Sequence, residues 1–106
     1  MQFQQSNTMD PYLRQKVLSA SPQQLIVYLY DLGIASCNNK NKVKLIRVIT
    51  HLKESLSFED KTEKISLTFQ SVYDHLLFLV RNDKFEEAKN IFFEIKQTWK
   101  QANKLI

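Results

Sequence analysis

Three side chains in this sequence are of types that often perform chemistry, but their spacing does not bring them together. His51, His75 and Cys37 lie far apart, whereas metal ligands usually recur at short, fixed intervals. The single cysteine cannot form an intrachain disulfide, which favours a reducing, cytosolic compartment. We therefore expect neither a metal nor a cofactor.

Paired carboxylates are another arrangement that could support catalysis. Asp31 and Asp74 each follow a tyrosine, and two carboxylates can act as general acid and general base. Nothing in the sequence places these two together, and the other acids do not form the inward Glu and Glu-x-x-His set of a di-metal bundle. Gly33 is the only glycine, so no glycine-rich loop can bind phosphate. The sequence predicts that the protein is not an enzyme.

Composition limits the elements that could position these residues. A chain of 106 residues with 43% hydrophobic residues fits one domain with a core. One glycine and two prolines leave few residues for the hairpin turns of a sheet. The net charge of +4 is mild, with acids beside the lysines, so we expect a solvated surface and no binding of nucleic acid.

Neither a membrane-spanning nor a secretory segment is expected. No apolar run approaches the ~18 residues of a membrane span, and the polar start MQFQQSNTMD lacks the pattern of a secretory signal. We expect a flexible N-terminus over residues 1–10, followed by a single domain over residues 11–106.

Capping residues and apolar spacing predict four helices. Ser21, Pro22 and Gln24 are typical of a helix start. The predicted helices run from Pro22 to about Cys37, from about Lys42 to Ser57, from a capping box at Asp60 and Glu63 to about Arg81, and from a box at Asp83 and Glu86 to Ile106. Short connections favour an all-α, antiparallel four-helix bundle. A short helix or extended strap over residues 11–19 precedes it, and no internal repeat is visible.

The first and third helices carry more apolar side chains than a bundle needs. In the first, Leu25, Leu29 and Leu32 can face the core, and a second stripe comprises Ile26, Tyr30, Gly33, Ile34 and Cys37. In the third, residues 76–80 are all apolar, and its second stripe comprises Tyr73, Leu77 and Val80. A bundle needs about three inward positions in seven. The two helices could therefore be central, could dimerise, or could form a groove for helices of another chain.

Several motifs resemble those of the FliS family of flagellar secretion chaperones. Ser21-Pro22, Leu25-Ile26 and Leu29-Tyr30-Asp31, with Tyr12 and Val17 upstream, resemble the family signature. Residues 55–59, residues 65–76 and Thr98-Trp99 resemble later family motifs. The resemblance covers residues 12 to about 102 in the right order. The link between the first two long helices is shorter than is usual in the family.

The resemblance implies a cytosolic export chaperone. Such a protein binds the C-terminal segment of flagellin, prevents its premature polymerisation and assists its delivery to the export gate of the flagellar type III apparatus. From the surplus apolar stripes we expect flagellin contacts at Ile26, Tyr30, Ile34, Tyr73 and Leu77. A strap of Tyr12, Leu13 and Val17 would cover this groove in the absence of flagellin.

Two further expectations concern Asp31 and the oligomeric state of the free chain. Asp31 is expected to make a structural hydrogen bond with backbone groups of the strap or of a helix end. The alternative to a chaperone is a helical homodimeric adaptor without flagellin binding. The free chain is accordingly expected to be a monomer or a weak homodimer.

Overall fold

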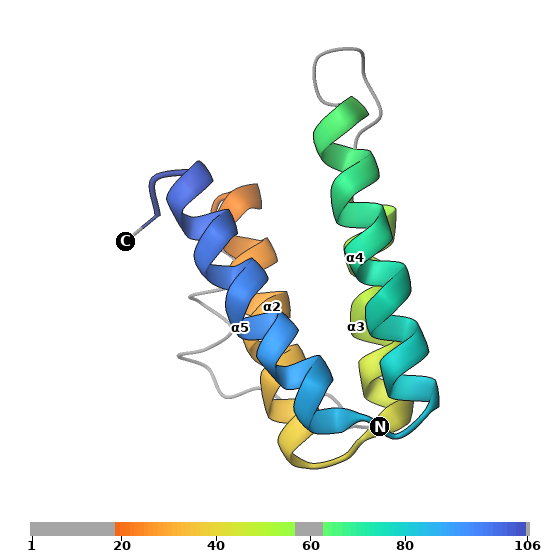
Figure 1. Cartoon of the computed structure of the whole chain (residues 1–106). Coiled ribbons are helices and arrows are strands. Elements are labelled where there is room, and N and C mark those ends of the chain that lie inside the picture. Colours follow the sequence, from red (N-terminus) through yellow and green to blue (C-terminus); the bar gives the residue numbers. More distant parts are fainter. Residues whose placement is uncertain (1–18, 57–62, 106) are drawn as a thin grey trace, which may run out of the picture.

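The computed structural model describes residues 19–56 and 63–105, and this part of the chain forms four helices (Figure 1). The helices are α2 (Pro22–Asn38), α3 (Lys42–Glu54), α4 (Glu63–Arg81) and α5 (Phe85–Ala102). The predicted all-α fold is therefore confirmed. The predictions for the flexible N-terminus, for the strap residues Tyr12, Leu13 and Val17, and for the cap at Asp60 concern residues outside the described ranges.

The four helices follow one another round the bundle in chain order. Helix α2 packs on α3 and α5, and α4 packs on the same two helices, so α2 and α4 lie diagonally across the core. Figure 1 shows α2 beside α5 and α3 beside α4 as two layers. The layers approach at the end that carries turns 39–41 and 82–84, here named the closed end, and diverge toward the other end.

The starts of α2 and α3 have side-chain caps. The hydroxyl of Ser21 accepts a hydrogen bond from the backbone N–H of Gln24 at 3.1 Å, which confirms the predicted cap. The side-chain oxygen of Asn41 accepts from the N–H of Lys44 in the same way at 3.1 Å. Each cap satisfies one backbone donor that the first helical turn leaves without a partner.

The predicted capping box at Asp83 and Glu86 is wrong. Asp83 has a φ of 60°, which is a left-handed conformation, and the residue that precedes α5 is Lys84, without a side-chain cap. The carboxylate of Asp83 instead pairs with the ammonium group of Lys42 at 2.7 Å. Asp83 therefore shapes the turn at the closed end rather than capping α5.

The core confirms the predicted inward faces of α3 and α5. The stripes contribute fully or nearly fully buried side chains from both helices, namely Leu45, Ile49, Leu52, Ala88, Phe92 and Ile95. In α4 the run 76–80 is buried except for Phe78, which is 56% exposed. The apolar surplus in this half of α4 is therefore explained by its packing against α3 and α5.

The two stripes of α2 do not divide between core and surface as predicted. Tyr30, Gly33 and Cys37 are buried, whereas Leu25 and Leu32 are each 37% exposed. Gly33 lies so close to α5 that a Cβ there would be 2.6 Å from the ring of Phe92. This face of α2 can approach α5 because it carries a glycine. The prediction that the leucines face the core is therefore wrong for Leu25 and Leu32, whereas Leu29 packs against the core.

The structure reveals an internal repeat that was not predicted from the sequence. Hairpin 1 (α2 and α3) and hairpin 2 (α4 and α5) correspond at an offset of 43 residues, the separation of Tyr30 and Tyr73. Three backbone hydrogen bonds, 39 to 35, 40 to 37 and 41 to 36, recur as 82 to 78, 83 to 80 and 84 to 79. Lys40 and Asp83 are equivalent and share the left-handed conformation, with φ of 53° and 60°.

Candidate functional site

Two tyrosines from diagonal helices meet at the centre of the bundle. Tyr30 of α2 and Tyr73 of α4 are 0% and 1% exposed, and their hydroxyl oxygens lie 2.7 Å apart in a hydrogen bond. Each hydroxyl thus has the partner that a buried polar group requires. The pair joins the two layers of the bundle across the core.

Burial raises the pKa of both phenols and of the Cys37 thiol above their ordinary values. Burial raises the pKa of Tyr73 to about 12, although its hydrogen bond with Tyr30 lowers it in part. Burial, together with repulsion from Tyr73, raises the pKa of Tyr30 still further. Burial also raises the pKa of the Cys37 thiol to about 11. A thiol in this state is a poor nucleophile, because the thiolate is the reactive form.

We expect the free energy of unfolding to fall as the pH rises from about 10 to about 12. In this range the unfolded chain loses phenol protons near the ordinary pKa of 10, whereas the folded chain retains them on Tyr30 and Tyr73. The contribution of these two phenols to the free energy of unfolding is complete below pH 10. Urea titrations at several pH values measure this slope in a Cys37→Ala background. The Tyr30→Phe/Tyr73→Phe variant should show a flatter profile, and equal slopes would contradict the expectation.

Each central tyrosine precedes an aspartate that pairs with a lysine of another helix. Asp31 lies 2.5 Å from Lys96 of α5, and Asp74 lies 2.5 Å from Lys53 of α3. These side chains are partly exposed, so each pair contributes at most about 1 kcal/mol. Within the described residues, the partner of Asp31 is therefore a lysine ammonium group. The expected bond to the backbone of the strap concerns residues outside the described ranges.

The structure separates the five predicted contact residues into two groups. Tyr30, Tyr73 and Leu77 are buried in the core, so their predicted place on an open groove is wrong. Ile26 and Ile34 are partly buried and pack against the edge of the core. Client contact through these two isoleucines stays a prediction.

The outward face of α2 carries apolar side chains that the core covers only in part. Leu25, Leu29 and Leu32, here named the leucine stripe, have the spacing by which helices recognise one another. Both ends of the stripe are 37% exposed, and Leu29 between them is partly buried. Other large apolar side chains are exposed on α3, α4 and α5, namely Val43, Ile65, Leu67, Phe78 and Phe93.

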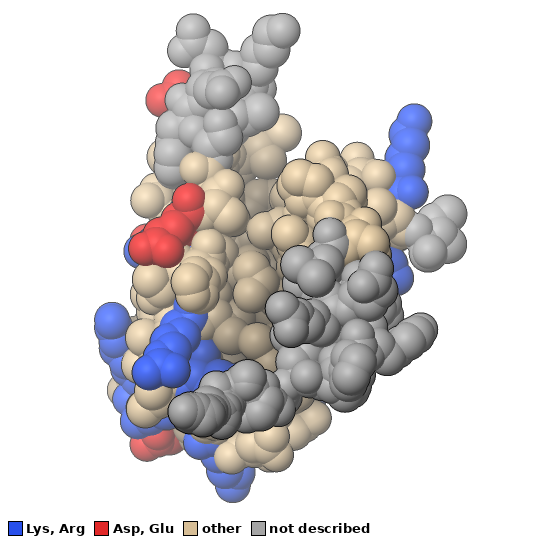
Figure 2. Space-filling model, turned by 180° about the vertical axis from the view of Figure 1, so that it is seen from behind, with Lys and Arg blue, Asp and Glu red and all other residues tan. Residues whose placement is uncertain are grey.

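The end of the bundle opposite the closed end is tied together by aromatic residues. The indole N–H of Trp99 on α5 donates to the backbone carbonyl of Gln23 on α2 at 2.9 Å. The Trp99 ring meets Phe69 of α4 edge to face at a centroid distance of 5.9 Å. Seen from behind, the surface between the two layers is hollowed and mostly lined by uncharged residues (Figure 2).

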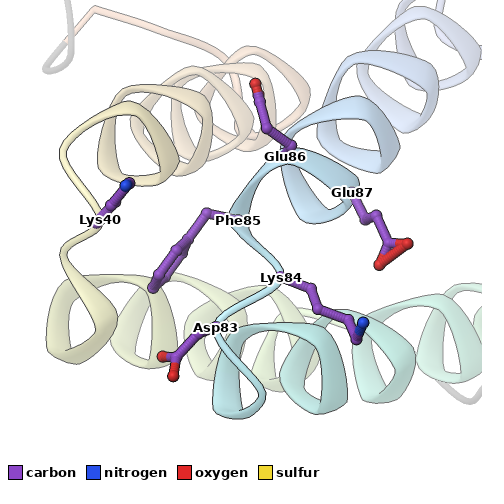
Figure 3. A pocket seen from close by; sticks show the side chains of 6 residues that line it. All are labelled: Lys40, Asp83, Lys84, Phe85, Glu86 and Glu87. Atoms are coloured by element: carbon purple, nitrogen blue, oxygen red, sulfur yellow. The ribbon is translucent and has the colours of Figure 1, made fainter.

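A second depression lies at the closed end (Figure 3). Phe85 points into the space between the two turns, whereas Glu86 and Glu87 point away from its ring. The lining combines positive and negative side chains, with Lys40, Asp83 and Lys84 completing it. Within residues 19–56 and 63–105, no three His, Cys, Asp or Glu side chains are grouped closely enough to hold a metal ion. The depression therefore offers no convergent set of ligands.

Comparison with known proteins identifies the family of the chain. The model of a family described as flagellar protein FliS matches residues 5–105. No curated protein and no solved structure matches the chain. None of the helices in the described part of the chain is long and apolar enough to cross a membrane.

Proposed function

Because this chain belongs to the FliS family of flagellar chaperones, we propose that it is a cytosolic export chaperone for flagellin. In this proposal it binds the C-terminal segment of flagellin and prevents premature polymerisation of the filament protein. It also assists delivery of flagellin to the flagellar type III export apparatus. The observation that carries the proposal is the family match over both hairpins, together with an apolar helix face that the core covers only in part.

The leucine stripe of α2 is the surface that we propose for the flagellin segment. An amphipathic client helix presents apolar side chains at intervals of three and four residues, and the stripe offers matching positions. The partly buried Ile26 and Ile34 are on the same helix and are the proposed additional contacts. Folding of a disordered client on binding costs at least about 2–5 kcal/mol. Affinity must therefore come from a long contact along the helix rather than from a single anchor.

Co-expression with a cognate flagellin tests the proposal directly. We expect a 1:1 complex in size-exclusion chromatography with light scattering, because one stripe accommodates one client segment. Deletion of the C-terminal segment of flagellin should abolish this complex, whereas deletion of its N-terminal segment should leave it intact. A complex that survives the C-terminal deletion would refute the proposed mode of binding.

A further inference from the structure

The leucine stripe lies along the border between the two helices of hairpin 1. Helix α2 contacts α5 through one of its flanks, which carries Gln23, Asp31 and Asn38. At 3.6 residues per turn, the leucine stripe falls on the opposite flank of the same helix. The other helix on which α2 packs is α3. The stripe is therefore bordered by side chains of α3.

A row of basic side chains on α3 lies along the same border. Helix α3 directs two of its lysines toward α4, where Lys53 pairs with that helix and Lys42 pairs with the turn that follows it. On the opposite side of α3, three exposed side chains follow one another at intervals of three and four residues. They are Lys44, Arg47 and His51, here named the basic row. Because α2 is the neighbour of α3 on that side, the basic row borders the leucine stripe.

The positive charge of the basic row is not neutralised within the described part of the chain. Lys44 and Arg47 form no ion pair there, and His51 has only an exposed contact with Glu54 at 3.7 Å. Helix α2 itself carries a single charged side chain, Asp31, which is already paired with α5. Seen from behind, lysine and arginine side chains are prominent on the layer of α3 and α4 toward the closed end (Figure 2). The surface beside the leucine stripe is therefore positively charged.

The equivalent surface of hairpin 2 has a different chemistry. At the offset of 43 residues, the positions of the leucine stripe are occupied by Thr68, Val72 and His75. The positions of the basic row are occupied by Glu87, Asn90 and Glu94. Hairpin 2 thus forms the same packing without a row of leucines and with acids in place of the cations. The combination of leucines and cations on hairpin 1 is therefore not required by the fold of the bundle.

We propose that the client of this surface is an amphipathic helix with an acidic flank. The apolar side of the client lies on the leucine stripe, and aspartate or glutamate side chains on one of its flanks face the basic row. This inference rests on the proposed function, because it specifies the kind of flagellin segment that the stripe accepts. Exposed charges at the edge of a contact favour partners of opposite charge and disfavour partners of like charge. The leucines then supply most of the affinity, and the basic row selects the client.

Two designed peptides test the selection without the use of flagellin. Both are helical and have leucines at the spacing of a client helix, but one flank carries glutamates in the first peptide and lysines in the second. In isothermal titration at low salt, the full-length chain should bind the glutamate peptide about tenfold more tightly. This preference should shrink between about 0.05 M and about 0.5 M salt, because salt screens exposed charges. Equal affinity for the two peptides at low salt would overturn the proposal.

Two double variants of equal net charge separate the basic row from the charge of the whole chain. Lys44→Glu/Arg47→Glu and the control Lys64→Glu/Arg81→Glu each change the formal net charge from +4 to zero. The control residues are exposed on α4, diagonally across the bundle from the leucine stripe. The first variant should lose the preference for the glutamate peptide, the control should retain it, and circular dichroism confirms that both are folded. Loss of the preference in both variants would overturn the proposal, because net charge alone would then explain it.

The same two variants, titrated with the flagellin C-terminal peptide, distinguish this inference from the proposed function. Affinity for that peptide should fall about tenfold in Lys44→Glu/Arg47→Glu and remain unchanged in the control. Flagellin binding that requires the leucines but not the basic row would overturn the acidic flank and leave the proposed function intact. A preference for the glutamate peptide without any binding of flagellin would instead refute the proposed function and support the inferred chemistry of the surface.

Discussion

A chain that carries Tyr30→Glu is expected to lose its cooperative unfolding transition at pH 7. The side chain of Tyr30 is fully buried, and its hydroxyl bonds to Tyr73. A carboxylate in this place would be charged, buried and without a cation, which costs several kcal/mol. Small domains are stable by only about 5–15 kcal/mol. The substitution should therefore remove most of the folded population.

Tyr30→Phe is the matched control, because it keeps the ring and removes only the hydroxyl. It should cost about 1–3 kcal/mol, since the hydroxyl of Tyr73 then lacks its partner. Tyr30→Phe/Tyr73→Phe should cost less than the sum of the two single changes, because neither hydroxyl is left unpaired. Circular dichroism during heating and urea titration compares these variants and Tyr73→Phe with the wild type. A wild-type transition in the glutamate variant would contradict the central position of Tyr30.

Charging the two ends of the leucine stripe is expected to abolish flagellin binding while the bundle remains folded. Leu25→Glu/Leu32→Glu removes two apolar anchors and places two carboxylates on the proposed contact face. Each lost anchor should weaken binding about tenfold or more, so the pair should lower affinity by ~100-fold. Isothermal titration with a flagellin C-terminal peptide gives the affinity, and circular dichroism confirms that the helices persist.

The control for this pair is Val43→Glu/Phe78→Glu. These two side chains are 64% and 56% exposed and lie on α3 and α4. The control therefore adds the same two negative charges as the leucine variant, but on other helices. The control should bind flagellin like the wild type. Equal loss of binding in both double variants would show that net charge decides affinity, and unchanged binding in the leucine variant would remove the stripe from the site.

The helices were predictable because their signals are local. The cap at Ser21 and the apolar spacing of α3 and α5 depend on residues within one or two turns. The same local chemistry gave a wrong prediction of a helix cap at Asp83, because aspartate both caps helices and tolerates the left-handed conformation. The choice between these roles depends on the path of the chain into α5, which a short sequence window does not contain.

The orientation of α2 was not predictable from its own residues. Its two apolar stripes are adjacent on the helix, and either could face a core. The close approach of Gly33 to Phe92 and the bond of Tyr30 to Tyr73 decide between them. Both contacts join residues that are distant in sequence and come from different hairpins.

A signal for the repeat was present in the sequence, although most equivalent positions differ. A Tyr-Asp pair occurs at residues 30–31 and again at 73–74, and a lysine follows at the same distance in each half, at 53 and 96. The aspartates suggested paired acids, whereas the structure assigns each of them to a lysine of the other hairpin. These recurring tyrosines, aspartates and lysines therefore make contacts that join the two halves.

The position of Trp99 gives the protein an intrinsic fluorescent reporter. It is the only tryptophan of the chain, and its indole contacts the first turn of α2 and the ring of Phe69 on α4. Emission from an indole shifts to longer wavelength when water replaces such neighbours. Detachment of the first turn of α2 from α5 can therefore be followed in real time by stopped-flow fluorescence, without a dye and without interference from a second tryptophan in the chain.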